Sequence, residues 1–479
     1  MIVQNQSSDF FQEEKAIYQF LHACYDEYCH TNIPRIVSFS QPLDDIDTLA
    51  VLQALIRDNR RHFYWECPKR EEAVLGFGAV KSSDINASNE LFDRDRFVRV
   101  RNFIQDCLQQ IVYPGPSYRA VAHPYFLCSF SFFATAESPD YPFPSATVFL
   151  PQFQIIRKKN RCLFVANLAV DNTLNPERGM EEISQTLQKL YQAPLNFLLA
   201  PRPRENYFHP RTKEENEHNF KIAVRAALQA IQTQQLSKIV LAHPLDLISP
   251  VPFKIVESLA NLRQNYPNCY LFAIANDRGH HFIGASPERS ISLHDGQLIT
   301  DALAGSAPRG QTPREDRVLA QKLLNSNKDR REHQAVSEFI SRRFAELNLQ
   351  IRRSPLQVLQ LDNIQHLHTQ ISACVPPTFD PLDIVAKLHP TPAVAGVPTQ
   401  AACESIHRYE HFNRALYAAP LGWIDAGKNS EFIVGIRSAA IIGDRARLYG
   451  GAGIVAGSSP EGELAEVRLK LQAMCQALV

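Results

Sequence analysis

The sequence lacks the features that most quickly assign a protein to a class. Its 50 Lys and Arg residues balance its 50 Asp and Glu residues, so no net charge favours nucleic acid or an anionic membrane surface. No apolar run approaches the roughly 20 residues that a membrane-spanning helix needs. Residues 1–15 show no basic region followed by an apolar stretch. We therefore expect a cytoplasmic protein with no nucleic-acid or membrane partner, in which any anionic ligand is held by a local site.

Several common catalytic and cofactor motifs are also missing. The ten cysteines form neither CxxC nor a zinc-ligand spacing, which favours free thiols in a reducing compartment. The glycine-rich stretch 450–457 is not GxGxxG and does not sit in a βαβ pattern, and no GxxxxGK[ST] occurs. There is no HExxH, no serine elbow and no catalytic Cys/His motif. These absences argue against a dinucleotide, P-loop, zinc-protease or hydrolase site.

The chain does contain many short strands mixed with helices, which predicts an α+β fold with a largely antiparallel sheet. Residues 146–151 and 161–166 are expected to pair, and hairpins are expected across Asp295-Gly296 and Gly443-Asp444. The polar stretch 201–219 is predicted to be a surface connection, dividing the chain into regions 1–205 and 206–479. We expect helices at 49–56, 91–112, 220–231, 318–344 and from 460, and strands at 63–66, 73–80, 146–151, 161–166, 239–242, 270–275, 281–283, 291–293, 298–300, 432–442 and 447–455.

Carboxylates and glycines gather near the C-terminus. Glu463, Glu466 and Lys470 share one face of the predicted last helix, and Glu332 lies in a charged helix at 328–333. Each pattern alone is usually a solvated face. Gly450, Gly451 and Gly453 precede the last helix, and glycines weaken a strand unless something approaches its backbone closely. If Glu332 points inward, two or three carboxylates plus water would suit octahedral Mg²⁺.

Three further residues follow or open predicted strands. Lys238 opens one strand, Glu288 follows another in a tight turn, and Arg437 adjoins an apolar run. Lys238 and Glu288 would form a base and acid pair if burial shifted their pKa values in opposite directions. A guanidinium in an apolar setting needs an anion, either a protein acid or a ligand carboxylate. An edge lysine, a turn glutamate and a structural ion pair are the ordinary alternatives.

These motifs together resemble the chorismate-utilising enzymes, which include anthranilate synthase component I and the aminodeoxychorismate, salicylate and isochorismate synthases. The similarity covers roughly residues 220–470. Its motifs appear in order as Lys238-Ile-Val-Leu-Ala, Gly284-Ala-Ser-Pro-Glu288, Leu303-Ala-Gly-Ser-Ala-Pro-Arg-Gly310, Lys328-Asp-Arg-Arg-Glu-His333, His366-Leu367, Leu388-His-Pro-Thr-Pro-Ala-Val394, Ile436-Arg437-Ser438, and Gly451-Ala-Gly-Ile-Val455 followed by Glu463 and Glu466. The resemblance implies two packed, mostly antiparallel sheets with outer helices, in which region 1–205 completes the sandwich.

The resemblance also implies roles for these residues. Lys238 would be the general base that activates water at C2 of chorismate, and Glu288 the general acid that protonates the departing C4 hydroxyl. The Mg²⁺ shell would comprise Glu332, Glu466 and Glu463. The remaining expected substrate-binding residues are Arg437, Lys470, Gly450, Gly451, Gly453, His366, Gly305, Ser306 and Ala393.

Within this family, the isochorismate-synthase type fits the sequence best. Members that eliminate pyruvate usually carry threonine where this chain has Ala393, and an alanine cannot hydrogen-bond near the enolpyruvyl group. We therefore expect an isomerase that keeps this group, acts without a glutaminase subunit and is a monomer. A salicylate synthase, an ammonia-using synthase and a catalytically silent chorismate-binding regulator are the alternatives. Ser306 replaces a threonine common in the family.

Overall fold

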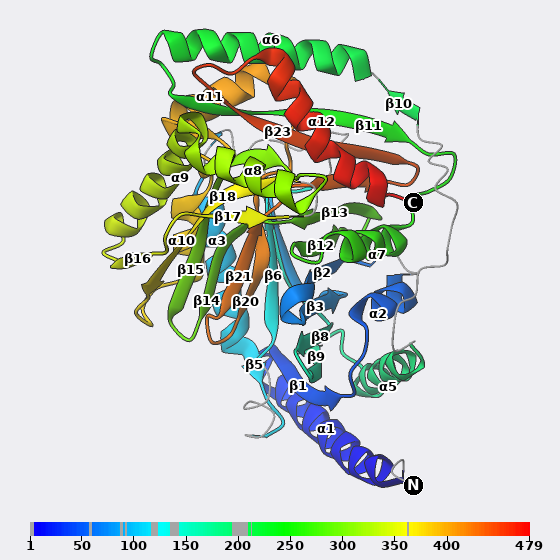
Figure 1. Cartoon of the computed structure of the whole chain (residues 1–479). Helices are drawn as coiled ribbons and strands as arrows, with labels where there is room; N and C mark the ends of the chain where they lie inside the picture. The colour runs from blue at the N-terminus through cyan, green and yellow to red at the C-terminus, as the bar shows by residue number, and fades with distance from the viewer. Residues whose placement is uncertain are drawn as a thin grey trace.

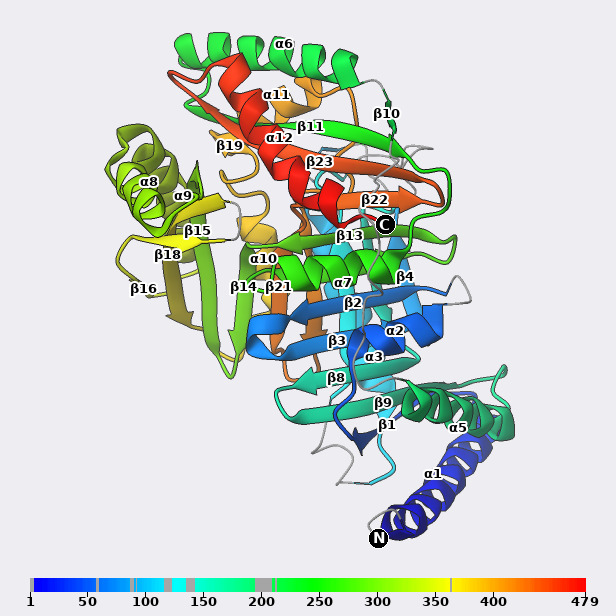
Figure 2. The same cartoon turned by 45° about the vertical axis from the view of Figure 1, so that its right-hand side comes forward.

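The computed structural model describes residues 4–56, 60–86, 90–91, 93–115, 123–134, 143–193, 209–211, 213–361 and 364–479 of the chain. In these residues the chain forms two large sheets that face each other, with helices on the outside (Figure 1). Figure 2 shows the strands of the first sheet running across those of the second. The predicted α+β fold of two mostly antiparallel sheets with outer helices is confirmed.

The first sheet takes strands from both ends of the chain. Its order is β10-β11-β23-β22-β13-β12-β2-β3-β8-β9-β1-β5, with β19 on β11. Among its described pairs, β1 and β5 run parallel and the others antiparallel. Its strands are β1 (Arg35–Leu43), β2 (His62–Cys67), β3 (Glu72–Phe77), β5 (Ile111–Val112), β8 (Phe153–Lys158), β9 (Arg161–Val170), β10 (His209–Arg211), β11 (Lys238–Ile248), β12 (Tyr270–Ala275), β13 (His280–Ser286), β19 (Gly396–Val397), β22 (Ser438–Ile442) and β23 (Arg445–Val455).

The second sheet is likewise shared between the two regions of the chain. Its order is β16-β18-β15-β14-β21-β20-β6-β7-β4, with β17 on β18. Its strands are β4 (Lys81–Ile85), β6 (Tyr125–Phe130), β7 (Ala146–Leu150), β14 (Arg289–His294), β15 (Gln297–Pro308), β16 (Ile351–Arg353), β17 (Gln357–Gln360), β18 (Ile364–Cys374), β20 (Pro420–Asp425) and β21 (Ser430–Val434). The proposed boundary at residue 205 lies outside the described residues.

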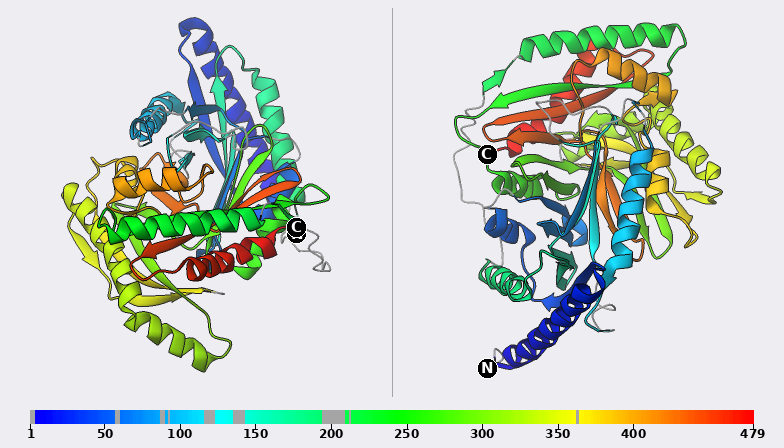
Figure 3. Two further views of the ribbon diagram at one scale, coloured as in Figure 1. Left: turned by 90° about the horizontal axis from the view of Figure 1, so that it is seen from above. Right: turned by 180° about the vertical axis from the view of Figure 1, so that it is seen from behind.

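Helices cover both sheets. Helices α6, α7 and α12 pack on the first sheet, whereas α3, α9 and α10 pack on the second, as the view from behind also shows (Figure 3). None of the described helices is long and apolar enough to cross a membrane. The helices are α1 (Gln4–Thr31), α2 (Thr48–Leu55), α3 (Asp95–Gln110), α5 (Pro176–Gln192), α6 (Lys213–Gln232), α7 (Ile255–Asn265), α8 (Pro313–Asn325), α9 (Asn327–Glu346), α10 (Pro381–Leu388), α11 (Thr399–Tyr409) and α12 (Pro460–Ala477), with a 3-10 turn at Pro68–Arg70.

One predicted strand pairing is wrong, and one predicted connection is partly structured. Residues 146–151 and 161–166 do not pair, because β7 belongs to the second sheet and β9 to the first, where β9 forms a hairpin with β8. Part of the predicted surface connection is structured, since β10 and the start of α6 fall within it. Acidic side chains in the first turns of α6 favour a helix there, because they face its partial positive charge.

Two predicted elements are broken in the structure. The helix expected at 318–344 is two helices, and Ser326 between them caps α9 by accepting from the amide of Asp329 (3.2 Å). The strand expected at 432–442 is also two strands, β21 in the second sheet and β22 in the first. The break coincides with Arg437, whose φ of +49° is a left-handed conformation that a strand does not contain. The expected hairpin across Gly443-Asp444 therefore starts at β22 rather than at residue 432.

The chain crosses from one sheet to the other twice at nearly the same place. Strand β13 passes into β14 through residues 287–288, and β21 passes into β22 through residues 435–437. The amide of Val434 donates to the carbonyl of Glu288 (3.0 Å), and the amide of Ala285 donates to the carbonyl of Arg437 (3.1 Å). Gly284 makes this approach possible, because a Cβ there would lie 2.6 Å from the Arg437 carbonyl oxygen. The two crossings fix Glu288 and Arg437 in adjacent segments.

A buried ion pair connects β11 to the loop before β20. Arg414 is 1% exposed and forms a two-pronged contact with Glu410 (2.8 and 2.6 Å). Its remaining N–H groups donate to the carbonyls of Val240 and Val394, both at 2.8 Å. Glu410 also accepts from the amide of Ala242 (2.7 Å). Removing one partner would leave a buried charge and several unpaired groups.

We therefore predict that Arg414→Ala lowers the free energy of unfolding by about 3–5 kcal/mol, measured by denaturant unfolding. Arg468→Ala is the matched control, because Arg468 is 54% exposed and pairs with Glu217. The control should cost at most about 1 kcal/mol. Equal small losses in both variants would show that the buried pair does not hold this part of the fold.

Candidate active site

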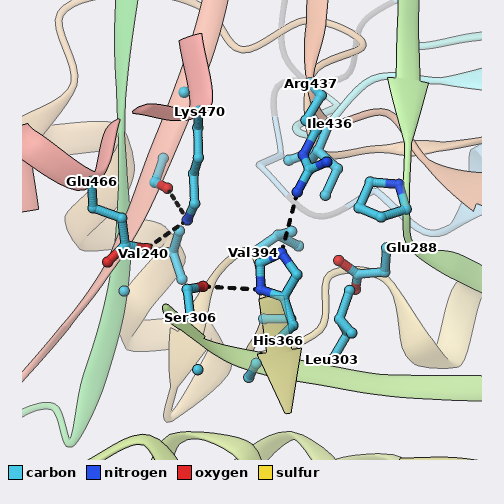
Figure 4. Close-up of a pocket in the computed structure, with 18 of the residues that line it drawn as sticks. Val240, Glu288, Leu303, Ser306, His366, Val394, Ile436, Arg437, Glu466 and Lys470 are labelled. Carbon is cyan, nitrogen blue, oxygen red and sulfur yellow. Dashed lines mark hydrogen bonds and ion pairs between the residues drawn. The ribbon is translucent and has the colours of Figure 1, made fainter. Parts of the chain in front are cut away.

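A pocket lies beside the two chain crossings, between β11 and β23 on one side and β15 and β18 on the other (Figure 4). Most of the residues predicted for the site line it. These are Glu288, Gly305, Ser306, Glu332, His366, Ala393, Arg437, Gly450, Gly451, Gly453, Glu466 and Lys470. Lys238 and Glu463 do not line it: Lys238 lies behind Gly453, and Glu463 is buried beside Lys328. The pocket thus brings together predicted residues that are up to 182 positions apart, from Glu288 to Lys470.

Arg437 is a buried cation in the pocket wall. It is 6% exposed, and among the described residues no carboxylate forms an ion pair with it. Its Nη2 donates to Nε2 of His366 (3.2 Å), and Nη1 lies 4.0 Å from Sγ of Cys269. A buried guanidinium without a counter-charge is costly. The pocket therefore offers an anion-binding position, and a carboxylate matches the guanidinium fork.

His366 links Arg437 to Ser306. Burial, followed by the nearby Arg437 and Lys470 charges, holds the pKa of His366 well below its usual value, so the ring is neutral. Arginine only donates, so Nε2 of His366 must accept and the ring proton must sit on Nδ1. Two acceptors then lie near the His366 ring proton, Oγ of Ser306 (3.0 Å from Nδ1) and the backbone of Gly305. The chain of contacts leaves the Ser306 hydroxyl proton available for another acceptor.

Glu288 lies on the opposite side of the pocket from Glu466 and Lys470 (Figure 4). Burial, reinforced by the negative charge of Asp301, raises its pKa to about 8, although Lys238 and Lys470 oppose this shift. No described group hydrogen-bonds its carboxyl oxygens, whereas its backbone forms hydrogen bonds with Ser286 and Val434. At neutral pH this side chain is therefore a carboxylic acid that can donate a proton into the pocket.

Lys238 and Glu332 form a buried ion pair behind Gly453. The Nζ–Oε1 distance is 2.9 Å, but the contact lacks hydrogen-bond geometry, so the ammonium has no described hydrogen-bond acceptor. Burial alone would raise the pKa of Glu332, but the contact with Lys238 and the charges of Lys470 and Lys328 together outweigh burial and lower it. A Cβ on Gly453 would lie 2.7 Å from Oε1 of Glu332, so this glycine makes room for the pair. At Gly453, the group that approaches the strand closely is therefore a protein side chain, the carboxylate of Glu332.

The three carboxylates proposed for Mg²⁺ each face a lysine. Glu466 accepts from Lys470 (2.7 Å), Glu463 accepts from Lys328 (3.2 Å), and Glu332 pairs with Lys238. Burial and the charge of Glu466 raise the pKa of Glu463. Their oxygen donors fit the chemistry of Mg²⁺. However, no group of three or more potential ligands converges on one point in the part of the chain that the structure describes.

Several pocket residues were not found from the sequence. Leu303, Val394 and Ile436 lie within the recognised motifs, but nothing in their positions indicated that they face a cavity. Tyr417 and Tyr449 also line it, with rings stacked at 4.9 Å and 15°. No motif surrounds Tyr417, and its place at the pocket follows only from the turn that precedes β20. For Tyr449, the one indication in the sequence was the alternation of side chains between the two faces of β23.

The fold and the pocket agree with comparisons to known proteins. The sequence profile of the family described as "chorismate binding enzyme" matches residues 19–479. The chain therefore belongs to the chorismate-binding enzyme family.

Two relatives extend over almost the whole chain. Isochorismate synthase MenF of Bacillus subtilis is 30% identical over 465 residues, which cover 96% of this chain and 97% of that protein. The salicylate biosynthesis isochorismate synthase of Pseudomonas aeruginosa is 31% identical over 458 residues, covering 93% and 90%. The predicted family is confirmed, and region 1–205 falls within the similarity as well.

Solved structures show the same architecture. MenF, the menaquinone-specific isochorismate synthase from Escherichia coli, matches with a TM-score of 0.75 and 25% identity, covering 97% of this chain and 99% of that chain. Anthranilate synthase component I from Streptococcus pneumoniae matches with a TM-score of 0.65 and 20% identity, covering 85% and 92%. The second match supports the fold only.

The pKa of Glu288 predicts how its substitution changes stability. Below about pH 4.3 the carboxyl is protonated in both the folded and the unfolded state. As the pH rises from there to about 8, the unfolded chain releases the proton that the folded chain keeps, so folding stability falls. Glu288→Gln removes this loss. We expect the free energy of unfolding of this variant to exceed that of the wild type by on the order of 1–3 kcal/mol at pH 8 and by little at pH 4.

Chemical unfolding at several pH values measures this difference. Glu404→Gln, at an exposed position of α11, is the control and should show no gain that grows with pH. A Glu288→Gln gain that is equal at pH 4 and pH 8 would contradict the raised pKa.

Proposed function

We propose that this protein is an isochorismate synthase that converts chorismate reversibly to isochorismate with Mg²⁺. The observation that carries the proposal is the presence of two buried groups in one pocket: Arg437, a cation without a protein anion, and Glu288, a carboxyl held in its acid form. Chorismate carries two carboxylates and a C4 hydroxyl, so it presents both an anion to the guanidinium and a leaving group to the acid. The names of the relatives support the same activity.

The reaction exchanges one hydroxyl for another. Water adds at C2 and loses a proton, the ring double bond shifts, and the C4 hydroxyl leaves as water after taking a proton. Atoms and charge therefore balance without an oxidant, a reductant or a second substrate. Because both sides of the reaction are similar in energy, the protein contributes mainly positioning and electrostatic stabilisation.

Binding is assigned to the cationic side of the pocket. Arg437 and Lys470 would hold the enolpyruvyl carboxylate, and the neutral His366 would fix the guanidinium through its 3.2 Å contact. Lys470 is itself anchored to the Gly451 carbonyl (2.8 Å), which orients its ammonium along the β23 backbone. The substrate is thereby placed with its ring between β23 and Glu288.

Proton transfer is assigned to Glu288 and Lys238. Glu288 would donate to the C4 oxygen, since it is the carboxylic acid that faces the cavity at neutral pH. Lys238 would accept the proton of the attacking water. It lies behind Gly453 in contact with Glu332, so this role requires it to lose a proton and to reach water in the pocket.

Glu332, Glu466 and Glu463 would hold Mg²⁺, which when bound would screen the ring carboxylate and ease the allylic displacement. The lysine contacts of these carboxylates show that the cluster is already balanced by positive charge. Metal binding would therefore have to compete with these ion pairs.

Ala393 supports retention of the enolpyruvyl group. It lies in the pocket wall, and its methyl group offers no hydrogen bond to this part of the substrate. We infer that isochorismate is released rather than cleaved further to salicylate and pyruvate, and that ammonia from a glutaminase subunit is not used.

The direct test is product analysis of the purified protein with chorismate and Mg²⁺, with and without EDTA and ammonia. The proposal predicts isochorismate as the product, loss of turnover with EDTA and no effect of ammonia. Salicylate plus pyruvate would contradict the role of Ala393. Anthranilate formed only with ammonia, or no turnover, would overturn the proposed reaction.

Substitution of the proton-transfer groups is expected to remove activity while preserving the fold. Lys238→Ala and Glu288→Gln should each lower kcat by roughly 10²–10⁴-fold. Steady-state kinetics with circular dichroism as a folding control measures this. Near-normal kcat in either variant would exclude that residue from proton transfer.

Loss of one proposed ligand should weaken metal binding. Glu332→Ala is expected to raise the Mg²⁺ concentration for half-maximal activity by roughly 10–100-fold, a range typical of groups that support a metal site. Direct Mg²⁺ titration by calorimetry provides a second measurement. Glu346→Ala, at the far end of α9, is the control and should leave Mg²⁺ dependence unchanged. An unchanged Glu332→Ala titration would remove Glu332 from the shell.

A further inference from the structure

A chain of buried polar side chains lies beside the pocket and is not used in the proposed reaction. Nη2 of Arg289 contacts both oxygens of Asp301 (3.1 and 3.0 Å). Nε2 of His368 lies 2.8 Å from Oδ1 of Asp301, and Nε2 of Gln357 lies 3.1 Å from Nδ1 of His368. The side chains of Arg289, Asp301 and His368 are only 15%, 12% and 13% exposed.

The network is joined to the pocket by three neighbouring strands. Arg289 follows Glu288 in the chain, Asp301 is two residues before the pocket residue Leu303, and His368 is two residues after His366. Side chains two apart in a strand point to the same face. Strand β15 pairs with both β14 and β18, so the three side chains form one layer next to the pocket residues.

The contacts keep Asp301 negatively charged. Burial alone would raise its pKa, but the hydrogen bond from His368 and the charge of Arg289 outweigh burial and lower it. If the Gln357 amide donates to Nδ1, the proton of a neutral His368 ring sits on Nε2 and donates to Asp301. A fixed anion is thereby held close to an acid that must stay protonated.

We infer that Asp301 is a positioning residue whose carboxylate, fixed by Arg289 and His368, adds to the effect of burial in keeping Glu288 in its acid form for proton donation. The inference rests on the proposed function. Two observations carry it: the layer is continuous with the pocket, and the Glu288 carboxyl has no hydrogen-bond partner among the described groups that would hold it in the acid form.

The two lysines near Glu288 oppose the effect of Asp301. Lys238 and Lys470 lower the pKa of Glu288, whereas Asp301 raises it. Tyr417 also faces Glu288, and burial raises the pKa of its hydroxyl, so it is uncharged. The other ionisable residues that line the pocket are Glu332, His366, Arg437, Tyr449 and Glu466. Asp301 is thus the anion whose removal is expected to make Glu288 a stronger acid.

Asp301→Asn tests the inference, because it removes the charge and preserves the side-chain shape. The alkaline limb of kcat/KM, expected near pH 8 in the wild type, should move down by about one pH unit. Activity at pH 8 should fall by roughly fivefold, and activity at pH 6 should change less. Restoration of the limb by Asp301→Glu would show that the charge is responsible.

Arg289→Gln provides a test of opposite sign. It removes the cation that balances Asp301, so the alkaline limb should move upward from the wild-type value. A merely structural role for the network would lower activity in both variants without moving the limb in opposite directions. Asp246→Asn is the control, since this aspartate also pairs with an arginine, Arg447, but lies outside the pocket lining. The alkaline limb of kcat/KM for Asp246→Asn should stay at the wild-type pH.

The same shift can be measured without turnover. In each background, the stability gained through Glu288→Gln grows with pH and levels off at the pKa of Glu288. The pH at which the gain levels off should fall in the Asp301→Asn background and rise in the Arg289→Gln background. Unmoved values in both backgrounds would overturn the inference even if the proposed function holds. Absence of isochorismate formation by the wild type would instead overturn the proposed function, and the stability measurement would still decide the role of Asp301.

Discussion

The structure of the pocket depends on one unbalanced charge, the guanidinium of Arg437. It is buried, it donates to a neutral histidine, and no described carboxylate neutralises it. Such a group costs folding free energy unless a ligand completes it. The fold holds it in place by the left-handed backbone at Arg437 and by hydrogen bonds between the two chain crossings. The anion-binding position therefore lowers the folding stability of the two-sheet structure.

The crossings also explain why acid and cation meet. Glu288 and Arg437 are far apart in sequence, yet each lies where a strand leaves one sheet for the other. Both residues are buried and lie between two strands rather than within one, and both side chains line the pocket. The remaining groups approach this pocket from β15, β18, β23 and α12. Small residues such as Gly284 and Gly453 provide the necessary space.

The sequence predicted the fold class, most strands of the second half and most of the residues that line the pocket. The motifs carried this information because they combine charged residues with glycines and strand ends. The sequence did not reveal the break at Arg437, since an apolar run on both sides looks like one continuous strand. It also did not reveal that Lys238 and Glu463 do not line the pocket, because strand and helix periodicity give the face of a residue and not its depth. Tyr417 and the Arg289–Asp301–His368 layer depend on long-range pairing, which local patterns do not encode.

In the proposed complex, the substrate's carboxylate supplies the counter-charge that Arg437 lacks. Calorimetric titration of chorismate into Glu288→Gln protein, which is expected to bind without turnover, measures this claim when compared with the Glu288→Gln, Arg437→Gln double variant. Loss of a charge-assisted contact of about 2–3 kcal/mol predicts an affinity lower by roughly 30–150-fold in the double variant. Equal affinity in the two proteins, with both folded, would contradict the account.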